Sequence, residues 1–179
     1  MTKGNSASFV SSLGIAVILM SGHAIAAPPV AVVSGVDSHV TKQAYRIADD
    51  EESFSTIYRE HLGLKKGDYF QTQHLNVDFS RYMVVAVFQG DDYNNRGIKV
   101  IDVVSNDRNC VIQYRPFWYQ TEGTVDLASS YAFVVIPKTR KPIQSDEDMR
   151  DNLSSPPKWS TKATLQIKPE EAPSTGKGR

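Results

Sequence analysis

The sequence predicts a mainly β protein of the α+β kind: a small antiparallel β-sandwich-like domain with one amphipathic helix near its N-terminus. Three observations lead to this prediction. Runs rich in β-branched and aromatic residues recur between residues 82 and 138, and clusters of turn-forming residues separate them. One stretch, residues 51–62, carries apolar side chains at helical spacing. Both ends of the chain have compositions that do not favour a packed core.

Residues 1–26 have the composition of a secretory signal peptide. Lys3 is the only charge before Asp37, an apolar run covers 13–20, and the small residues at 24–26 match an A-x-A cleavage pattern. The apolar run is shorter than the roughly 20 residues that cross a bilayer. We expect cleavage after residue 26, export to the bacterial periplasm or the medium, and no membrane insertion afterwards. A buried core helix is the alternative interpretation of the apolar run.

The first elements of the mature chain are expected to be a linker, a strand and a helix. The Pro-led segment 27–39 is interpreted as a linker and residues 40–47 as a strand. Acidic residues cluster in the first turn of the helix expected at 51–62, where the helix dipole favours them, and Gly63 follows its last apolar position. The apolar stripe of this helix is Phe54, Ile57, Tyr58 and Leu62.

The strands that follow are predicted from apolar runs and turn residues. Residues 82–90 are almost continuously apolar, which is typical of a central strand buried on both faces. Residues 98–104 and 110–114 are expected to pair as a hairpin, and 131–138 to form a later strand. Residues 141–144 are expected to be at most a short edge strand.

The composition changes at residue 145. The segment 145–179 is rich in Pro, Ser and charge, so burial would not offset the entropy lost on ordering. We therefore expect a largely disordered tail, in which residues 161–168 are able to add a strand to a neighbour. The folded β-rich domain is expected to span 40–144.

Charge argues against polyanionic partners. The chain has 20 basic and 20 acidic residues, and removal of the signal peptide takes away one Lys and no acid. A net charge of −1 does not fit a nucleic-acid-binding protein, which normally has a basic face. An anionic membrane surface is excluded by the same argument, so we expect another exported protein as the partner.

Known catalytic motifs are absent from the sequence. There is no G-x-S-x-G, H-E-x-x-H or Gly-rich phosphate loop, so we expect a non-enzyme without catalytic residues, metal or cofactor. Cys110, the only cysteine, is interpreted as a buried inert thiol, with a reactive or intermolecular thiol as the alternative. His61 is interpreted as a partner of the helix dipole. The acidic and amide residues at 90–95 lack EF-hand spacing and are interpreted as a solvated turn.

An aromatic run after the strand at 110–114 is the candidate binding surface. Tyr, Trp and Arg are enriched at binding hot spots, and Arg115 is expected to stack on a ring or to pair with a carboxylate. Two interpretations stay open: Phe117 and Trp118 plug the open end of a sandwich, or the run is a recognition loop. The candidate residues, with those of the neighbouring turn, are Arg115, Phe117, Trp118, Tyr119, Asp92, Tyr93 and Arg96.

The order of motifs resembles the PrcB C-terminal domain family. The stretches "VDFSRYMVVAVFQG" (77–90) and "SSYAFVVIPK" (129–138) carry the resemblance, which covers about 45–143. The chain departs from the family pattern at 91–97, where relatives have a Thr- and Gly-rich turn and this sequence has "DDYNNRG". The resemblance implies an exported, non-catalytic accessory protein of a protease complex.

A second resemblance suggests another function. "YRPFW" (114–118) is similar to the Arg-Pro-Trp loop of chagasin-type cysteine protease inhibitors, although the other two inhibitory loops of that family are not recognisable. Three hypotheses follow: an accessory module that assists or stabilises a partner such as a protease, an inhibitor that uses Arg115 to Trp118, and a structural domain with no separate binding loop. A hydrolase has no specific support.

Overall fold

The structure is a computed structural model, which describes residues 25–26, 31–65, 68, 75–118 and 126–167. The expected signal peptide therefore lies outside the described residues except for Ile25 and Ala26. Tyr119, one of the candidate binding residues, lies outside them as well. The last part of the expected tail, residues 168–179, is also outside the described part of the chain.

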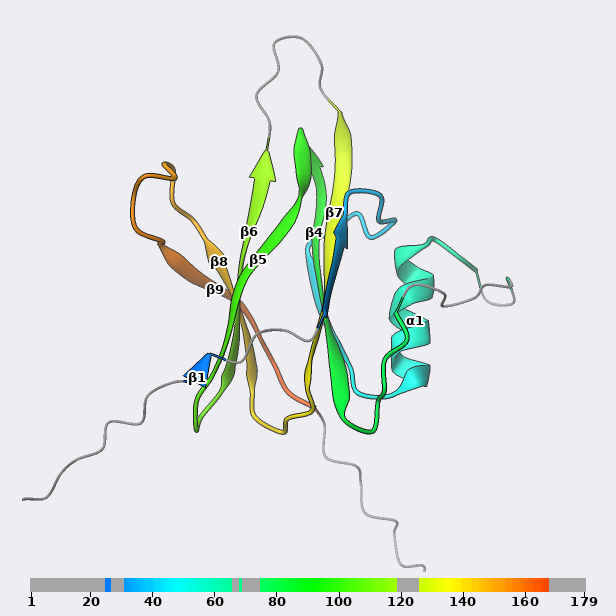
Figure 1. Cartoon of the computed structure of the whole chain (residues 1–179). Coiled ribbons are helices and arrows are strands. Elements are labelled where there is room, and N and C mark those ends of the chain that lie inside the picture. The colour runs from blue at the N-terminus through cyan, green and yellow to red at the C-terminus, as the bar shows by residue number, and fades with distance from the viewer. Residues whose placement is uncertain (1–24, 27–30, 66–67, 69–74, 119–125, 168–179) are drawn as a thin grey trace, which may run out of the picture.

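Two β-sheets packed face to face form the body of the molecule (Figure 1). The first sheet contains, in spatial order, β1 (Ile25–Ala26), β5 (Asn95–Ser105), β6 (Cys110–Trp118), β8 (Ile143–Asp148) and β9 (Trp159–Leu165). The second contains β2 (Ala31–Gly35), β7 (Leu127–Pro137), β4 (Tyr82–Tyr93) and β3 (Ala44–Ala48). One helix, α1 (Glu51–His61), lies on the outer face of the second sheet. The predicted mainly β sandwich with one helix is confirmed.

β4 is buried on both faces, as its sequence predicted. Alternate residues point in opposite directions along a strand. Met83, Val85 and Val87 therefore pack between the sheets, whereas Val84, Ala86 and Phe88 pack under α1. The molecule thus has two apolar layers that share this strand. Full burial of each large side chain contributes about 1.5–3 kcal/mol to folding.

The helix begins at the predicted residue and ends at His61, one residue before the predicted end. Leu62 of the predicted apolar stripe is the C-cap residue and is exposed, and His61 is buried in its place. The Asp50 carboxylate accepts a hydrogen bond from the Ser53 backbone N–H at 2.7 Å, and the Ser53 hydroxyl accepts one from the Asp50 N–H. This reciprocal cap satisfies N–H groups that have no partner inside the helix. At the other end Gly63 has a φ of 67°, the left-handed conformation that commonly ends a helix.

Both boundaries expected for the folded domain are wrong. The segment interpreted as a linker contains β2, which pairs antiparallel with β7. The segment interpreted as a tail contains most of β8 and all of β9, and residues 141–144 lead into an interior strand instead of an edge strand. β8 also pairs parallel with β6, so the first sheet is mixed, not purely antiparallel.

The tail orders because its polar side chains have partners inside the protein. Glu147 accepts a hydrogen bond from the Tyr114 hydroxyl at 3.2 Å and lies 3.8 Å from the Lys162 Nζ. Asp148 accepts one from the Arg150 Nε at 2.5 Å. A buried carboxylate is tolerated where such partners compensate its desolvation, and composition alone does not reveal them.

Candidate functional site

The candidate site lies at the end of the sandwich where β4 and β6 finish and β5 and β7 begin (Figure 1). The chain passes from the second sheet to the first through Asn94, the single residue between β4 and β5. Its φ is 57°, a left-handed conformation that Asn adopts more readily than most residues. Its N–H donates to the Asp126 carbonyl at 2.8 Å. The predicted solvated turn at 90–95 is therefore mostly strand, with a one-residue crossing between sheets.

Trp118 is held by a side chain from the opposite sheet. Its indole Nε1 donates a hydrogen bond to the Asp92 carboxylate at 2.7 Å, and Asp92 lies on β4. The other oxygen of Asp92 accepts from the Tyr93 N–H at 2.8 Å, which orients the carboxylate. Trp118 is nevertheless 51% exposed. The structure thus places a large aromatic ring in water with its one polar atom already paired.

Three more exposed apolar side chains lie at this end. Tyr93 and Leu127 are cross-strand partners in β4 and β7, 60% and 58% exposed. Phe117, 40% exposed, lies over Gly97 of β5. We call the set Tyr93, Phe117, Trp118 and Leu127 the Trp118 patch. Phe117 and Trp118 are both too exposed to be a fully buried core plug. By strand alternation Trp118 shares the inner face of β6 with buried Pro116, whereas Phe117 lies on the outer face.

Arg115 is directed to β8. Its Nη1 lies 4.0 Å from the Asp148 carboxylate, in agreement with the predicted pairing with a carboxylate, whereas the other predicted role, stacking on Trp118 or Tyr119, involves Tyr119, which lies outside the described residues. Burial raises the pKa of Asp148, but hydrogen bonds from Lys158 and Arg150 outweigh it and hold the pKa below its usual value. Arg96 is exposed near the patch. The structure thus brings Asp92 and Trp118 into contact and places Tyr93 and Phe117 at the same end of the sandwich, whereas Arg115 is paired with Asp148.

Leu127 was missed by sequence reasoning. It follows a stretch rich in small and polar residues and precedes the strand expected at 131, so no partner could be assigned to it from the sequence. Its pairing with Tyr93 depends on the register of β7 against β4, which shifts at a bulge between Phe88 and Gly90. The register of two strands far apart in the sequence cannot be predicted from local residue types. The one sequence signal for Leu127 was an apolar residue next to a polar stretch.

The remaining reactive groups do not form a catalytic arrangement among the described residues. Cys110 is buried between the sheets, as predicted, and burial raises the pKa of its thiol. His61 lies on the other side of the second sheet, so the two side chains do not meet. The described part of the chain contains no group of three His, Cys, Asp or Glu side chains that could hold a metal ion.

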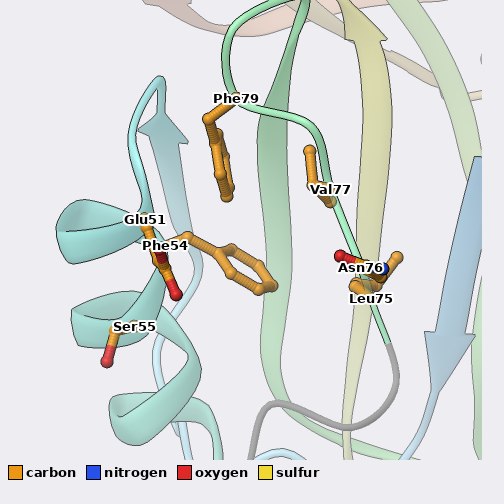
Figure 2. A pocket seen from close by; sticks show the side chains of 7 residues that line it. All are labelled: Glu51, Phe54, Ser55, Leu75, Asn76, Val77 and Phe79. Carbon is orange, nitrogen blue, oxygen red and sulfur yellow. The ribbon is translucent and has the colours of Figure 1, made fainter.

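A groove of about 340 Å³ lies elsewhere, between α1 and the segment that leads into β4 (Figure 2). Phe54 points from the helix toward the segment, and Phe79 and Val77 lie across from it. The full lining is Glu51, Phe54, Ser55, Leu75, Asn76, Val77 and Phe79. Among the described residues that line the groove, Glu51 is the only ionisable one, so they provide no acid–base pair for chemistry.

Comparison with known proteins leaves the site to be interpreted from its own geometry. No protein-family model matches the chain, and neither a curated protein nor a solved structure matches it significantly. Within the described residues, no helix is long and apolar enough to cross a membrane. The exposed aromatic side chains of the Trp118 patch are the feature that most needs a functional explanation.

Proposed function

We propose that the protein is an exported, non-catalytic accessory module that binds another exported protein through the Trp118 patch. The observation that carries this proposal is Trp118 itself, half exposed and fixed in place by Asp92. Exposed apolar residues that occur singly need no explanation, but several large ones at one end of a domain are typical of an interaction site.

The hydrogen bond to Asp92 supports this function because it prepares the ring for binding. A side chain that is ordered before binding loses less conformational entropy when a partner covers it. The bond also satisfies the indole N–H, so a partner can cover the ring without leaving a buried donor unpaired. The partner would then cover the exposed ring of Trp118 at the end of the sandwich, with Phe117 and Tyr93 at the border of the contact.

The partner that fits this patch is a protein with an apolar pocket. Trp and Tyr at the centre of an interface are frequent hot spots, and truncation of one typically weakens binding by about 2 kcal/mol, roughly 30-fold. A protease is the first candidate, because the motifs at 77–90 and 129–138 resemble those of PrcB-type accessory proteins.

The inhibitor hypothesis has less support from the geometry. A wedge formed by Arg115 to Trp118 needs a protruding loop, whereas these residues belong to β6, with Pro116 buried and Arg115 directed to Asp148. The purely structural hypothesis has to explain why large aromatic side chains stay exposed at this end.

Site-specific photo-crosslinking in the producing cell tests the proposal. A benzoylphenylalanine at position 93 should give a discrete protein adduct, and Trp118→Ala in the same chain should remove it. The matched control carries the crosslinker at position 107, an exposed residue in the β5–β6 turn at the opposite end of the sandwich. Absence of an adduct at 93, or the same adduct from 107, would contradict the proposed surface.

A further inference from the structure

His61 lies inside the aromatic layer between α1 and the second sheet. Its side chain is only 3% exposed, and its ring centroid is 4.1 Å from that of Tyr131 and 5.3 Å from that of Phe133. Its Nδ1 is buried and has no hydrogen-bond partner among the described residues. A neutral imidazole tolerates these surroundings better than a cation, because an unpaired buried charge costs much more free energy than an unpaired neutral group.

The groups around the ring do not compensate a positive charge fully. Burial lowers the pKa of His61 most, the negative charge of Asp37 opposes this effect, and His39 adds to it. Burial also raises the pKa of Tyr58 and Tyr131, so both phenols stay neutral. The titratable groups that face His61 within the described residues are Asp37 and His39 from the segment between β2 and β3, Tyr58 from α1, and Tyr131 from β7.

His61 is also the place where α1 is attached to the rest of the fold. Its backbone carbonyl accepts a hydrogen bond from the His39 N–H at 2.8 Å. Ser38, the residue before His39, donates its N–H to the Ser129 carbonyl of β7 at 3.0 Å. Gly63 leaves room for the His39 ring, because a Cβ at this position would lie 2.7 Å from it. The end of the helix, residues 37–39 and β7 therefore meet at His61.

We propose that His61 is an acid-sensitive latch: protonation of its ring loosens α1 and residues 37–39 from the second sheet while the core between the sheets stays folded. The layer that opens would expose Phe54, Phe88 and Phe133, which pack around α1. The inter-sheet core contains no histidine, so protonation of imidazole does not act there.

The direction of the pH effect follows from the lowered pKa. As pH falls below about 6.5, the ordinary value for His, the opened state takes up a proton before the closed state does. The stabilising effect of neutral His61 is therefore complete above that pH and is lost as pH falls toward the pKa of the closed state. Within this window the opening equilibrium constant rises by up to about tenfold per pH unit.

Hydrogen exchange read by mass spectrometry tests the latch on the mature chain. Between pH 7.5 and 5.5, after correction for intrinsic exchange, the wild type should lose protection in residues 51–61 but not in β6. His61→Phe, which keeps a ring and removes the titrating group, should abolish this difference. His39→Gln removes the neighbouring histidine but keeps the backbone contact to His61, so residues 51–61 should still lose protection as pH falls. Unchanged protection of α1 in the wild type, or the same loss in His61→Phe, would overturn the proposal.

A direct titration keeps the test independent of how the variants fold. The ring of His61 is followed by NMR in the wild-type protein from pH 8 to pH 4.5. A midpoint below 6.5, accompanied by broadening of α1 amide signals, is the expected result. A midpoint at or above 6.5 would overturn the latch, because the closed state would then prefer the charged ring.

Discussion

The orientation of Trp118 depends on a single hydrogen-bonded pair. Asp92 reaches it from the other sheet and is itself oriented by the Tyr93 N–H. Exposed polar pairs contribute little to folding free energy, but they restrict which rotamer a side chain adopts. At the scale of the residue, the main role of the Asp92 carboxylate is therefore to hold the exposed ring of Trp118 in one position.

Replacement of Asp92 should release the ring without unfolding the protein. We expect Asp92→Ala to lower the free energy of unfolding by at most about 1 kcal/mol, because the pair is exposed to solvent. Trp118 should become easier to quench. The measurement is acrylamide quenching in a Trp159→Phe background, where Trp118 is the only tryptophan. Asp107→Ala is the matched control, and equal quenching in both variants would contradict the role assigned to Asp92.

At the scale of the element, a network of polar side chains connects four strands, β3, β6, β8 and β9, across the sandwich. Burial, and next the contact with Tyr45, raise the pKa of Tyr114, so its hydroxyl stays protonated and donates to Glu147 of β8. Tyr45 of β3 lies 2.8 Å from the same hydroxyl, and Lys162 of β9 approaches Glu147. These polar contacts thus close the side of the sandwich where β3 and β9 come together, and each of these strands is an edge strand of its sheet.

Removal of the central hydroxyl should destabilise the whole fold. Tyr114→Phe keeps the ring but leaves the Tyr45 hydroxyl and the buried Glu147 each with one partner fewer. Loss of a partner for buried polar groups costs about 1–3 kcal/mol, and we expect a loss of this size in urea unfolding. Tyr93→Phe, the same change at an exposed position, should stay within about 0.5 kcal/mol of the wild type. Equal effects of the two changes would count against the network.

At the scale of the whole molecule, the described strands extend from β1 to β9, well beyond the domain of residues 40–144 that composition suggested. β8 lies between β6 and β9, so it covers one edge of the strand that carries Ile112 and Tyr114. The Pro-led segment with β2 and the polar segment with β8 and β9, both left outside the expected domain, therefore complete opposite sheets.

Truncation tests whether the folded domain ends at residue 144, as composition suggested, or includes β8 and β9, as the structure shows. A chain of residues 27–144 should fail to unfold cooperatively, because β6 loses its neighbour and the inter-sheet core becomes exposed to water. A chain of residues 27–167 should melt within a few degrees of the mature protein, as followed by circular dichroism. Cooperative melting of the shorter chain at the same temperature would show that β8 and β9 are dispensable.

Much of the candidate site could be anticipated from local residue types. The aromatic run at 117–118 and the acidic residues before Asn94 were recognisable in the sequence, and both belong to the site. Whether the aromatic residues faced inward was not recognisable, because that depends on which face of β6 meets the other sheet. Leu127 and the bond between Trp118 and Asp92 also depend on contacts between residues far apart in the chain.

The sequence by itself determined the class of fold, the helix with its first residue and its last to within one position, the buried β4 and the buried thiol of Cys110. These features depend on periodicity and on capping residues, which act over a few neighbouring positions. The tertiary structure alone decided that β2, β8 and β9 belong to the sandwich and that Trp118 is exposed. The physical reason is that these features depend on residues far apart in the chain: β2 is ordered by pairing with β7, and a buried carboxylate such as Glu147 is stable only where a distant residue, here Tyr114, supplies its partner.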